Sequence, residues 1–277
     1  MNIKVDPFKN NIGASISCDL KSIEPKTINQ IKEALNNYGF VCFRDQNLEP
    51  GEYLKFAQEL GKIKEYPMLK DLENHKGITV VERKENDKGK SYGEGWHTDS
   101  SYLNKTPKYT CLMGKIVKKD QGQTLFASQL ASYEALDQKT KDKIENLVGV
   151  FSSAGPISVT RLEREAERGT GKSKDFLAEH SIVKKVGIKK SLYLSPGHTI
   201  AIKNLSEEES KNLLKFLFNH QTKKEFQTSF FWEKNTIVIW DNHSVIHSAT
   251  PFQGRRMMHR IIPVSYTHLT LPTTPYV

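Results

Sequence analysis

The sequence has no run of about 18 consecutive apolar residues, which is the length that a membrane-spanning helix needs. Residues 1–8 also lack the apolar stretch that begins a secretory signal. These two absences give no indication of membrane insertion or export, and we expect no membrane partner. A cytoplasmic protein is the resulting expectation.

Cysteine is scarce, with three residues in a chain of 277, at Cys18, Cys42 and Cys111. They are odd in number, far apart in the chain, and none belongs to a CxxC pair. Such spacing excludes a cysteine-built metal site and does not suit a disulfide framework. A reducing compartment fits this usage best.

Dense basic blocks are missing too, although the formal net charge is +9. The lysines are scattered, without interleaved aromatic residues, and no recognisable nucleic-acid-binding motif is present. We interpret the charge as a lysine-rich surface that favours solubility, and we expect no nucleic-acid partner. A nucleic-acid-binding protein is the rival interpretation, which salt-dependent affinity for DNA or RNA would reveal.

What is present suits a globular protein of one large domain or two small ones. Helical spacing of apolar residues predicts one helix ending at Gly39 and a second over Pro50–Leu60, and a capping box of Ser206 and Glu209 predicts a third. Strand patterns dominate the middle and the end of the chain, with three strands expected over residues 225–263. These patterns predict a mainly β fold with flanking helices and a double-stranded β-helix (jelly-roll) core.

Two segments fall outside this pattern. Residues 150–180 are rich in glycine, serine, lysine and glutamate, and we expect a mobile excursion there, either a lid or a disordered segment. The final stretch contains "VSYTHLTLPTT", which resembles the translation of a sequencing adapter. We therefore expect a single domain over residues 1–263, a non-native tail over residues 264–277, and a native C-terminus that is missing.

The stretch "GEGWHTDSSY" places a histidine and a carboxylate one residue apart. If it forms a strand, His97 and Asp99 project from the same face. One imidazole nitrogen and one carboxylate oxygen can then bind a metal ion, although a surface ion pair explains the motif equally well. A mononuclear iron site of the two-histidine, one-carboxylate kind needs one more imidazole. The candidates in the C-terminal strand region are His243, His247 and His259.

Three motifs, in chain order, carry a resemblance to a known family: "WHTDSSY", "GQTLFASQLASYEAL" and "WDNHSVIHSATPFQGRRMMHR". Over nearly its whole length the chain resembles the taurine dioxygenase/2,4-dichlorophenoxyacetate dioxygenase (TauD/TfdA) family of Fe(II)- and 2-oxoglutarate-dependent oxygenases. The resemblance implies that the catalytic metal ligands are His97, Asp99 and His247. Packing or hydrogen bonding then accounts for His243 and His259.

The same resemblance places the cosubstrate. Thr124 matches the threonine that hydrogen-bonds 2-oxoglutarate, and Arg256 matches the arginine that pairs with its far carboxylate, a contact that suits the forked guanidinium. Arg260 is implied to lie near the substrate, and strand alternation puts it on the same face as Arg256. The segment between His247 and Arg256 is somewhat shorter than in the taurine and herbicide enzymes, so Arg260 stays open as an alternative anchor for the cosubstrate.

The implied function is a dioxygenase that uses Fe(II), 2-oxoglutarate and O2 to hydroxylate a small organic substrate, with release of succinate and CO2. Arg260 has no obvious acidic partner in the sequence, and a buried guanidinium without one should recruit an anion, so we expect a carboxylate substrate. Taurine is disfavoured because Gly93 stands where the taurine enzyme has an asparagine. The alternative is a non-redox, cupin-like isomerase or sensor, in which Thr124 and the arginine pair have no role. A homo-oligomer also stays open.

Overall fold

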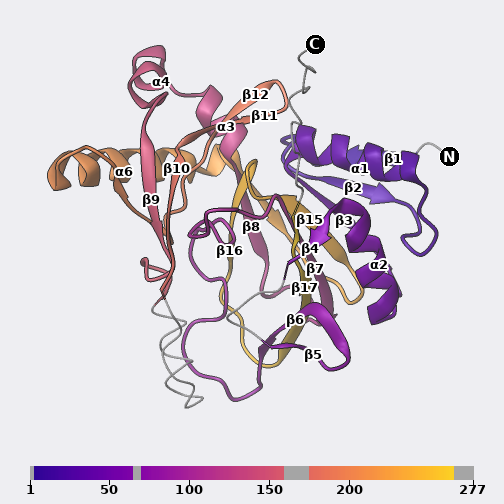
Figure 1. Ribbon diagram of the computed structural model, residues 1–277. Helices are drawn as coiled ribbons and strands as arrows, with labels where there is room; N and C mark the ends of the chain where they lie inside the picture. Colours follow the sequence, from indigo (N-terminus) through magenta and orange to yellow (C-terminus); the bar gives the residue numbers. More distant parts are fainter. Residues whose placement is uncertain (1–2, 65–69, 159–174, 265–277) are drawn as a thin grey trace, which may run out of the picture.

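The computed structural model describes residues 3–64, 70–158 and 175–264, in which two β-sheets face each other as a jelly roll (Figure 1). The larger sheet has eight strands, all antiparallel to their neighbours except β2 beside β3. In spatial order they are β1 (Lys4–Pro7), β2 (Ala14–Ser17), β3 (Phe40–Phe43), β15 (Ile237–Asp241), β7 (Tyr109–Ile116), β17 (Arg256–Ile261), β6 (His75–Arg83) and β5 (Asp71–Leu72). The predicted fold class is confirmed.

The smaller sheet consists of three antiparallel strands, β14 (Gln227–Phe230), β8 (Thr124–Ser128) and β16 (Val245–Ala249). An apolar core lies between the sheets and includes Phe126 of the smaller sheet and Trp240 of the larger one. Every residue of β3 and β15 is buried, because alternate side chains enter this core and a second core on the outer face of the larger sheet. A continuous apolar run is therefore the sequence pattern of these central strands.

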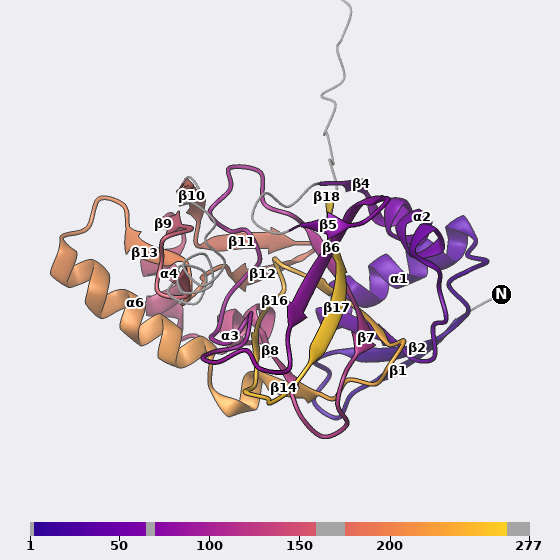
Figure 2. The ribbon, with the colours of Figure 1, turned by 90° about the horizontal axis from the view of Figure 1, so that it is seen from below.

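Two helices, α1 (Pro25–Tyr38) and α2 (Pro50–Leu60), cover the outer face of the larger sheet (Figure 2). Helix α1 ends where Gly39 adopts a φ of 79°, a conformation that glycine takes at little cost. Helix α2 begins with a proline after a capping box formed by Glu49 and Glu52. Both helices match the sequence prediction. No helix in the described ranges is both long and apolar enough to cross a membrane.

A second group of elements lies on the opposite side of the molecule from α1 and α2 (Figures 1 and 2). It surrounds an apolar core of its own and includes the predicted capping box of Ser206 and Glu209. The elements are α3 (Gln129–Glu134), α4 (Gln138–Ile144), β9 (Val148–Ser152), β10 (Leu177–Ser181), β11 (Val183–Val186), β12 (Lys189–Leu192), β13 (Thr199–Ile202), α6 (Glu207–Gln221) and the 3-10 turn η1 (Lys224–Phe226).

The expected excursion over residues 150–180 is partly corrected. Its two ends belong to β9 and β10, which pair with each other in register, so they are sheet and not a mobile loop. Its centre, residues 159–174, lies outside the described residues. The expectation of a lid falls on this segment and stays a prediction.

The C-terminal region also differs from expectation, because four strands, β14 to β17, occupy it where three were predicted. A short fifth strand, β18 (Pro263–Val264), pairs with β4 (Lys62–Ile63) and is buried. Val264, one residue past the predicted domain boundary, thus belongs to a strand of the fold. Residues 265–277 of the predicted tail lie outside the described residues.

Candidate metal site

His97 and Asp99 lie in a loop, which corrects the expectation of a strand. His97 forms one isolated antiparallel bridge with His247, in which each backbone N–H donates to the other residue's carbonyl oxygen over 2.9 Å. Asp99 follows in a turn, and Ser100 has a φ of 49°. This bridge and a second one, between Glu94 and Ala249, join the loop to β16 and bring the two histidines together, although they stand far apart in the sequence.

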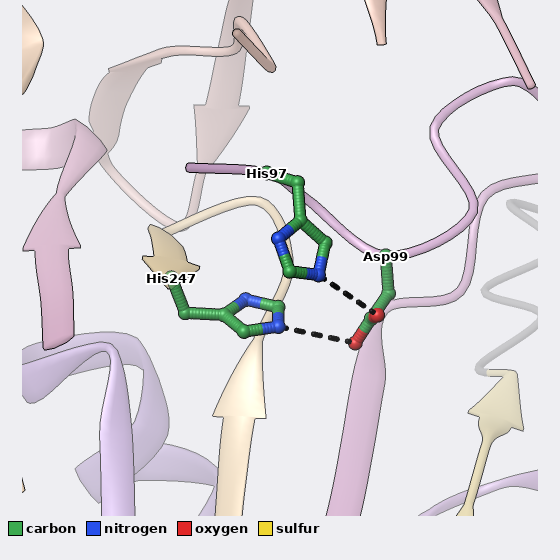
Figure 3. A group of neighbouring side chains, drawn as sticks. All are labelled: His97, Asp99 and His247. Atoms are coloured by element: carbon green, nitrogen blue, oxygen red, sulfur yellow. Dashed lines mark ion pairs between the residues drawn. The ribbon is translucent and has the colours of Figure 1, made fainter. Parts of the chain in front are cut away.

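The side chains of His97, Asp99 and His247 converge on one point (Figure 3). One ligand atom from each lies within 4.8 Å of the others. The Nε2 atom of His97 is 3.9 Å from Asp99 Oδ1, and the Nε2 atom of His247 is 3.9 Å from Asp99 Oδ2. All three side chains are buried, so this is a prepared internal group and not a surface ion pair.

The electrostatics of the group keep all three side chains in the form that binds a metal. Burial lowers the pKa of His97 and lowers that of His247 to about 3, so both imidazoles are neutral near neutral pH. Burial by itself would raise the pKa of Asp99, but the charge of Arg260 and the hydrogen bond from Thr110 favour the carboxylate, and the pKa is lowered. Two neutral imidazoles and one carboxylate suit a divalent metal such as Fe(II). The donor set fits the metal that the sequence motifs implied.

Hydrogen bonds orient two of the three ligands. His97 Nδ1 donates to the carbonyl oxygen of Gly95 over 2.8 Å, which leaves Nε2 with its lone pair toward the other ligands. His247 Nδ1 has no hydrogen-bond partner among the described residues, and the Trp240 ring packs 4.7 Å from the imidazole instead. Packing against the core thus replaces a hydrogen bond in orienting this second histidine.

A buried network supports Asp99 from behind. Thr110 Oγ1, on β7, donates to Asp99 Oδ2 over 2.8 Å and accepts from Asn242 Nδ2 over 3.0 Å. Asn242 Oδ1 accepts from the Asp99 backbone N–H and from Trp240 Nε1. The sequence reasoning did not find Thr110, since a threonine in an apolar strand carries no motif. The available signal for Thr110 was its position as a polar residue in a strand that is otherwise largely buried and apolar.

The predicted cosubstrate residues lie in the same pocket as the ligand group. Thr124 Oγ1 accepts a hydrogen bond from Trp232 Nε1 over 2.9 Å, and Arg256 Nη1 donates to the Gly122 carbonyl oxygen over 2.6 Å. Arg256 is 9% exposed and lies against the Phe252 ring. Burial lowers its pKa to about 10, so the guanidinium still carries its charge at neutral pH.

Arg260 lines the pocket together with Arg256, as strand alternation predicted. The expectation that no acidic residue stands beside it is wrong, because Arg260 Nη1 lies 3.7 Å from Asp99 Oδ1 and the guanidinium is 4% exposed. The reason is topological. Strand β17 is far from the ligand loop in the sequence but lies beside it in the folded chain, which sequence spacing does not show. His259 points away from this face, and neither it nor His243 joins the ligand group among the described residues.

Comparison with known proteins decides the family. The family model described as "Taurine catabolism dioxygenase TauD, TfdA family" matches residues 4–262. The chain belongs to the TauD/TfdA family. The chain is also 30% identical to an alkylsulfatase of Acinetobacter baylyi, over 91% of this chain and 80% of the relative.

Two further TauD/TfdA-like proteins extend this result. The chain is 28% identical to the (S)-phenoxypropionate/alpha-ketoglutarate-dioxygenase of Sphingobium herbicidovorans, over 86% of this chain and 88% of the relative. Its fold matches the crystal structure of AAD-2 in complex with Mn(II) and N-oxalylglycine with a TM-score of 0.81 and 25% identity, over 95% of this chain and 98% of that one. The likeness therefore covers the whole TauD/TfdA domain, not one motif.

Proposed function

We propose that this TauD/TfdA chain is an Fe(II)- and 2-oxoglutarate-dependent dioxygenase that hydroxylates a small organic anion. The observation that carries the proposal is the buried group of His97, Asp99 and His247, which shares one pocket with two buried arginines. A non-redox cupin-like protein would need the metal ligands but has no use for the arginines or Thr124. The family membership supports the same choice.

The metal ligands in this proposal are His97, Asp99 and His247. Bound Fe(II) would supply the redox chemistry that couples decarboxylation of 2-oxoglutarate by O2 to hydroxylation of the substrate. The protein's own contribution is to hold three donors close together, with neutral imidazoles and a fixed carboxylate. The apolar side chains of Leu112 and Met258 also line the pocket and make it less favourable for water.

Arg256 is the proposed anchor for the far carboxylate of 2-oxoglutarate, with Thr124 as its partner. Both lie beside Trp232, whose indole N–H donates to Thr124 and whose ring is 5.8 Å from the Arg256 guanidinium. Arg260 instead stands beside the ligand carboxylate of Asp99. This separation supports Arg256 as the cosubstrate anchor and Arg260 as the substrate residue.

The charges buried in the pocket support a substrate with a single negative charge. Arg256, Arg260 and Asp99 are each at least nine-tenths buried and together carry one net positive charge. A divalent metal raises this sum and the two carboxylates of 2-oxoglutarate cancel the increase, so one positive charge is left. Because uncompensated charge is costly in a buried site, a monoanionic substrate completes the pocket. A carboxylate remains our proposal, with an alkyl sulfate as the rival that the alkylsulfatase relative introduces.

A substrate screen that measures succinate formation tests this function. Small carboxylates, alkyl sulfates and their uncharged amide or alcohol counterparts are each added with Fe(II), 2-oxoglutarate and O2. We expect the charged compounds to stimulate succinate release and the uncharged ones to fail. Equal stimulation by both would contradict the anion requirement, and metal binding with no succinate under any condition would favour the cupin-like alternative.

A further inference from the structure

Arg260 and the proposed metal share one carboxylate, and the inference drawn here rests on the proposed function. Arg260 Nη1 lies 3.7 Å from Asp99 Oδ1, and that same oxygen lies 3.9 Å from His97 Nε2. The exposed fractions are 4% for Arg260 and 6% for Asp99. A cation held by the three ligands therefore sits within a few ångströms of a fixed guanidinium, in a place where water screens little.

Arg260 and a metal ion are two cations that share one buried carboxylate oxygen. The guanidinium lies no farther from Asp99 Oδ1 than His97 Nε2 does, so the two positive charges repel each other in a place where water screens little. Arg260 thus opposes metal binding unless another negative group neutralises it.

We propose that Arg260 couples the two binding events in this pocket, so that a monoanion bound at Arg260 strengthens metal binding and the metal strengthens anion binding. The coupling is reciprocal because metal binding and anion binding belong to one thermodynamic cycle, so each changes the affinity for the other by the same factor. The anion removes the repulsion between the guanidinium and the metal, and the metal draws Asp99 away from the guanidinium. In this way the metal site becomes complete only together with the organic acid.

A purely structural role is the rival explanation. If Arg260 serves only to hold Asp99 in position, its removal should weaken metal binding, as loss of a supporting contact normally does. If Arg260 opposes the metal, its removal should strengthen metal binding. The two accounts predict opposite signs for one measurement.

The experiment measures the affinity of the full chain for Mn(II) without 2-oxoglutarate, by titration with detection of free Mn(II). We expect Arg260→Met to bind Mn(II) roughly tenfold more tightly than the unaltered protein, within the range of ordinary coupling energies. Arg260→Lys keeps the charge and should stay near the unaltered value. Arg255→Met is the control and should leave Mn(II) binding unchanged, since Arg255 is exposed and pairs with Glu82 instead of Asp99. Equal or weaker binding by Arg260→Met would overturn the proposal.

A second measurement uses the unaltered protein and so does not depend on a variant that folds. Hexyl sulfate carries one negative charge, an apolar tail and oxygens that are poor metal ligands. It should tighten Mn(II) binding about fivefold or more, whereas 1-hexanol should not. The effect should disappear in Arg260→Met and persist in Arg255→Met.

The outcomes separate the coupling from the function on which it rests. Mn(II) binding that hexyl sulfate leaves unchanged would overturn the coupling alone. No Mn(II) binding by the unaltered protein would contradict the proposed metal site and the coupling with it.

Discussion

At the scale of single residues, the site depends on one side chain that a motif marks and on one that no motif marks. Asp99 owes its orientation to Thr110 and Asn242, which are fully buried and hydrogen-bonded to each other. Asn242 follows a tryptophan and an aspartate in a recognisable motif, whereas Thr110 is one polar residue in a buried strand. A buried hydroxyl is tolerated there because it has both a donor and an acceptor to satisfy.

Replacing Thr110 should therefore weaken metal binding without unfolding the protein. Thr110→Val keeps the shape of the side chain but removes the hydrogen bond to Asp99 and leaves the Asn242 amide without its acceptor. We expect Mn(II) affinity to fall roughly ten- to a hundredfold, the usual effect of losing a supporting contact. Thr110→Ser should restore most of it. Unchanged affinity in Thr110→Val would show that Asp99 is held by other contacts.

Substitutions of the two buried arginines should have different effects on succinate formation. Arg256→Ala should raise the 2-oxoglutarate concentration needed for half-maximal succinate formation by about ten- to a hundredfold, because it removes a charge-assisted contact. Arg260→Ala should affect that requirement much less and the organic-acid requirement more. The reverse order would assign the cosubstrate to Arg260, the alternative that the shorter preceding segment left open.

At the scale of helices and strands, local sequence signals were sufficient to predict the elements that are stabilised by contacts between residues close in the sequence. Helices α1 and α2 were predictable because apolar spacing, proline and glycine mark their limits. The ligand loop was not predictable, since a histidine and an aspartate one residue apart suggest a strand, whereas tertiary pairing with β16 forms two isolated bridges. The extra strand near the C-terminus was missed for the same reason: short strands in this fold are defined by distant partners.

The capping box of α6 offers a test at this scale. Ser206 Oγ accepts from the Glu209 backbone N–H, and the Glu209 side chain accepts from the Ser206 backbone N–H. Ser206→Ala should lower the free energy of unfolding by about 1 kcal/mol, measured by urea denaturation. Lys211→Ala, an exposed change on the same helix, is the control and should have little effect. Equal effects of the two changes would show that the cap does not stabilise the helix.

At the scale of the whole molecule, a jelly roll places the site between its two sheets, with helices on one side and a separate group of elements on the other (Figure 1). The order of motifs along the chain predicted this architecture and the three proposed ligands. Sequence could not predict that Arg260 meets Asp99, because β17 and the ligand loop approach only in the folded chain. We propose that the native domain includes Val264, which β18 buries against β4.

Buried histidines should make the metal-free protein sensitive to acid. Burial lowers the pKa of His259 from 6.5 to about 4, and burial also lowers that of His243. The unfolded chain therefore binds more protons than the folded one as the pH falls from about 6.5 to 4, and stability is lost in that window. Urea denaturation across this pH range should show a smaller loss in His259→Gln, and an unchanged loss would remove His259 as a cause.

The most direct test of the central account is succinate formation by the unaltered protein and by His247→Ala, compared at the same Fe(II) concentration. Removing one of three ligands should abolish metal-dependent turnover while thermal unfolding stays close to that of the unaltered chain. We predict succinate from 2-oxoglutarate in the unaltered protein only when Fe(II) and O2 are both present, and none in the variant. Full turnover by His247→Ala would contradict the proposed site.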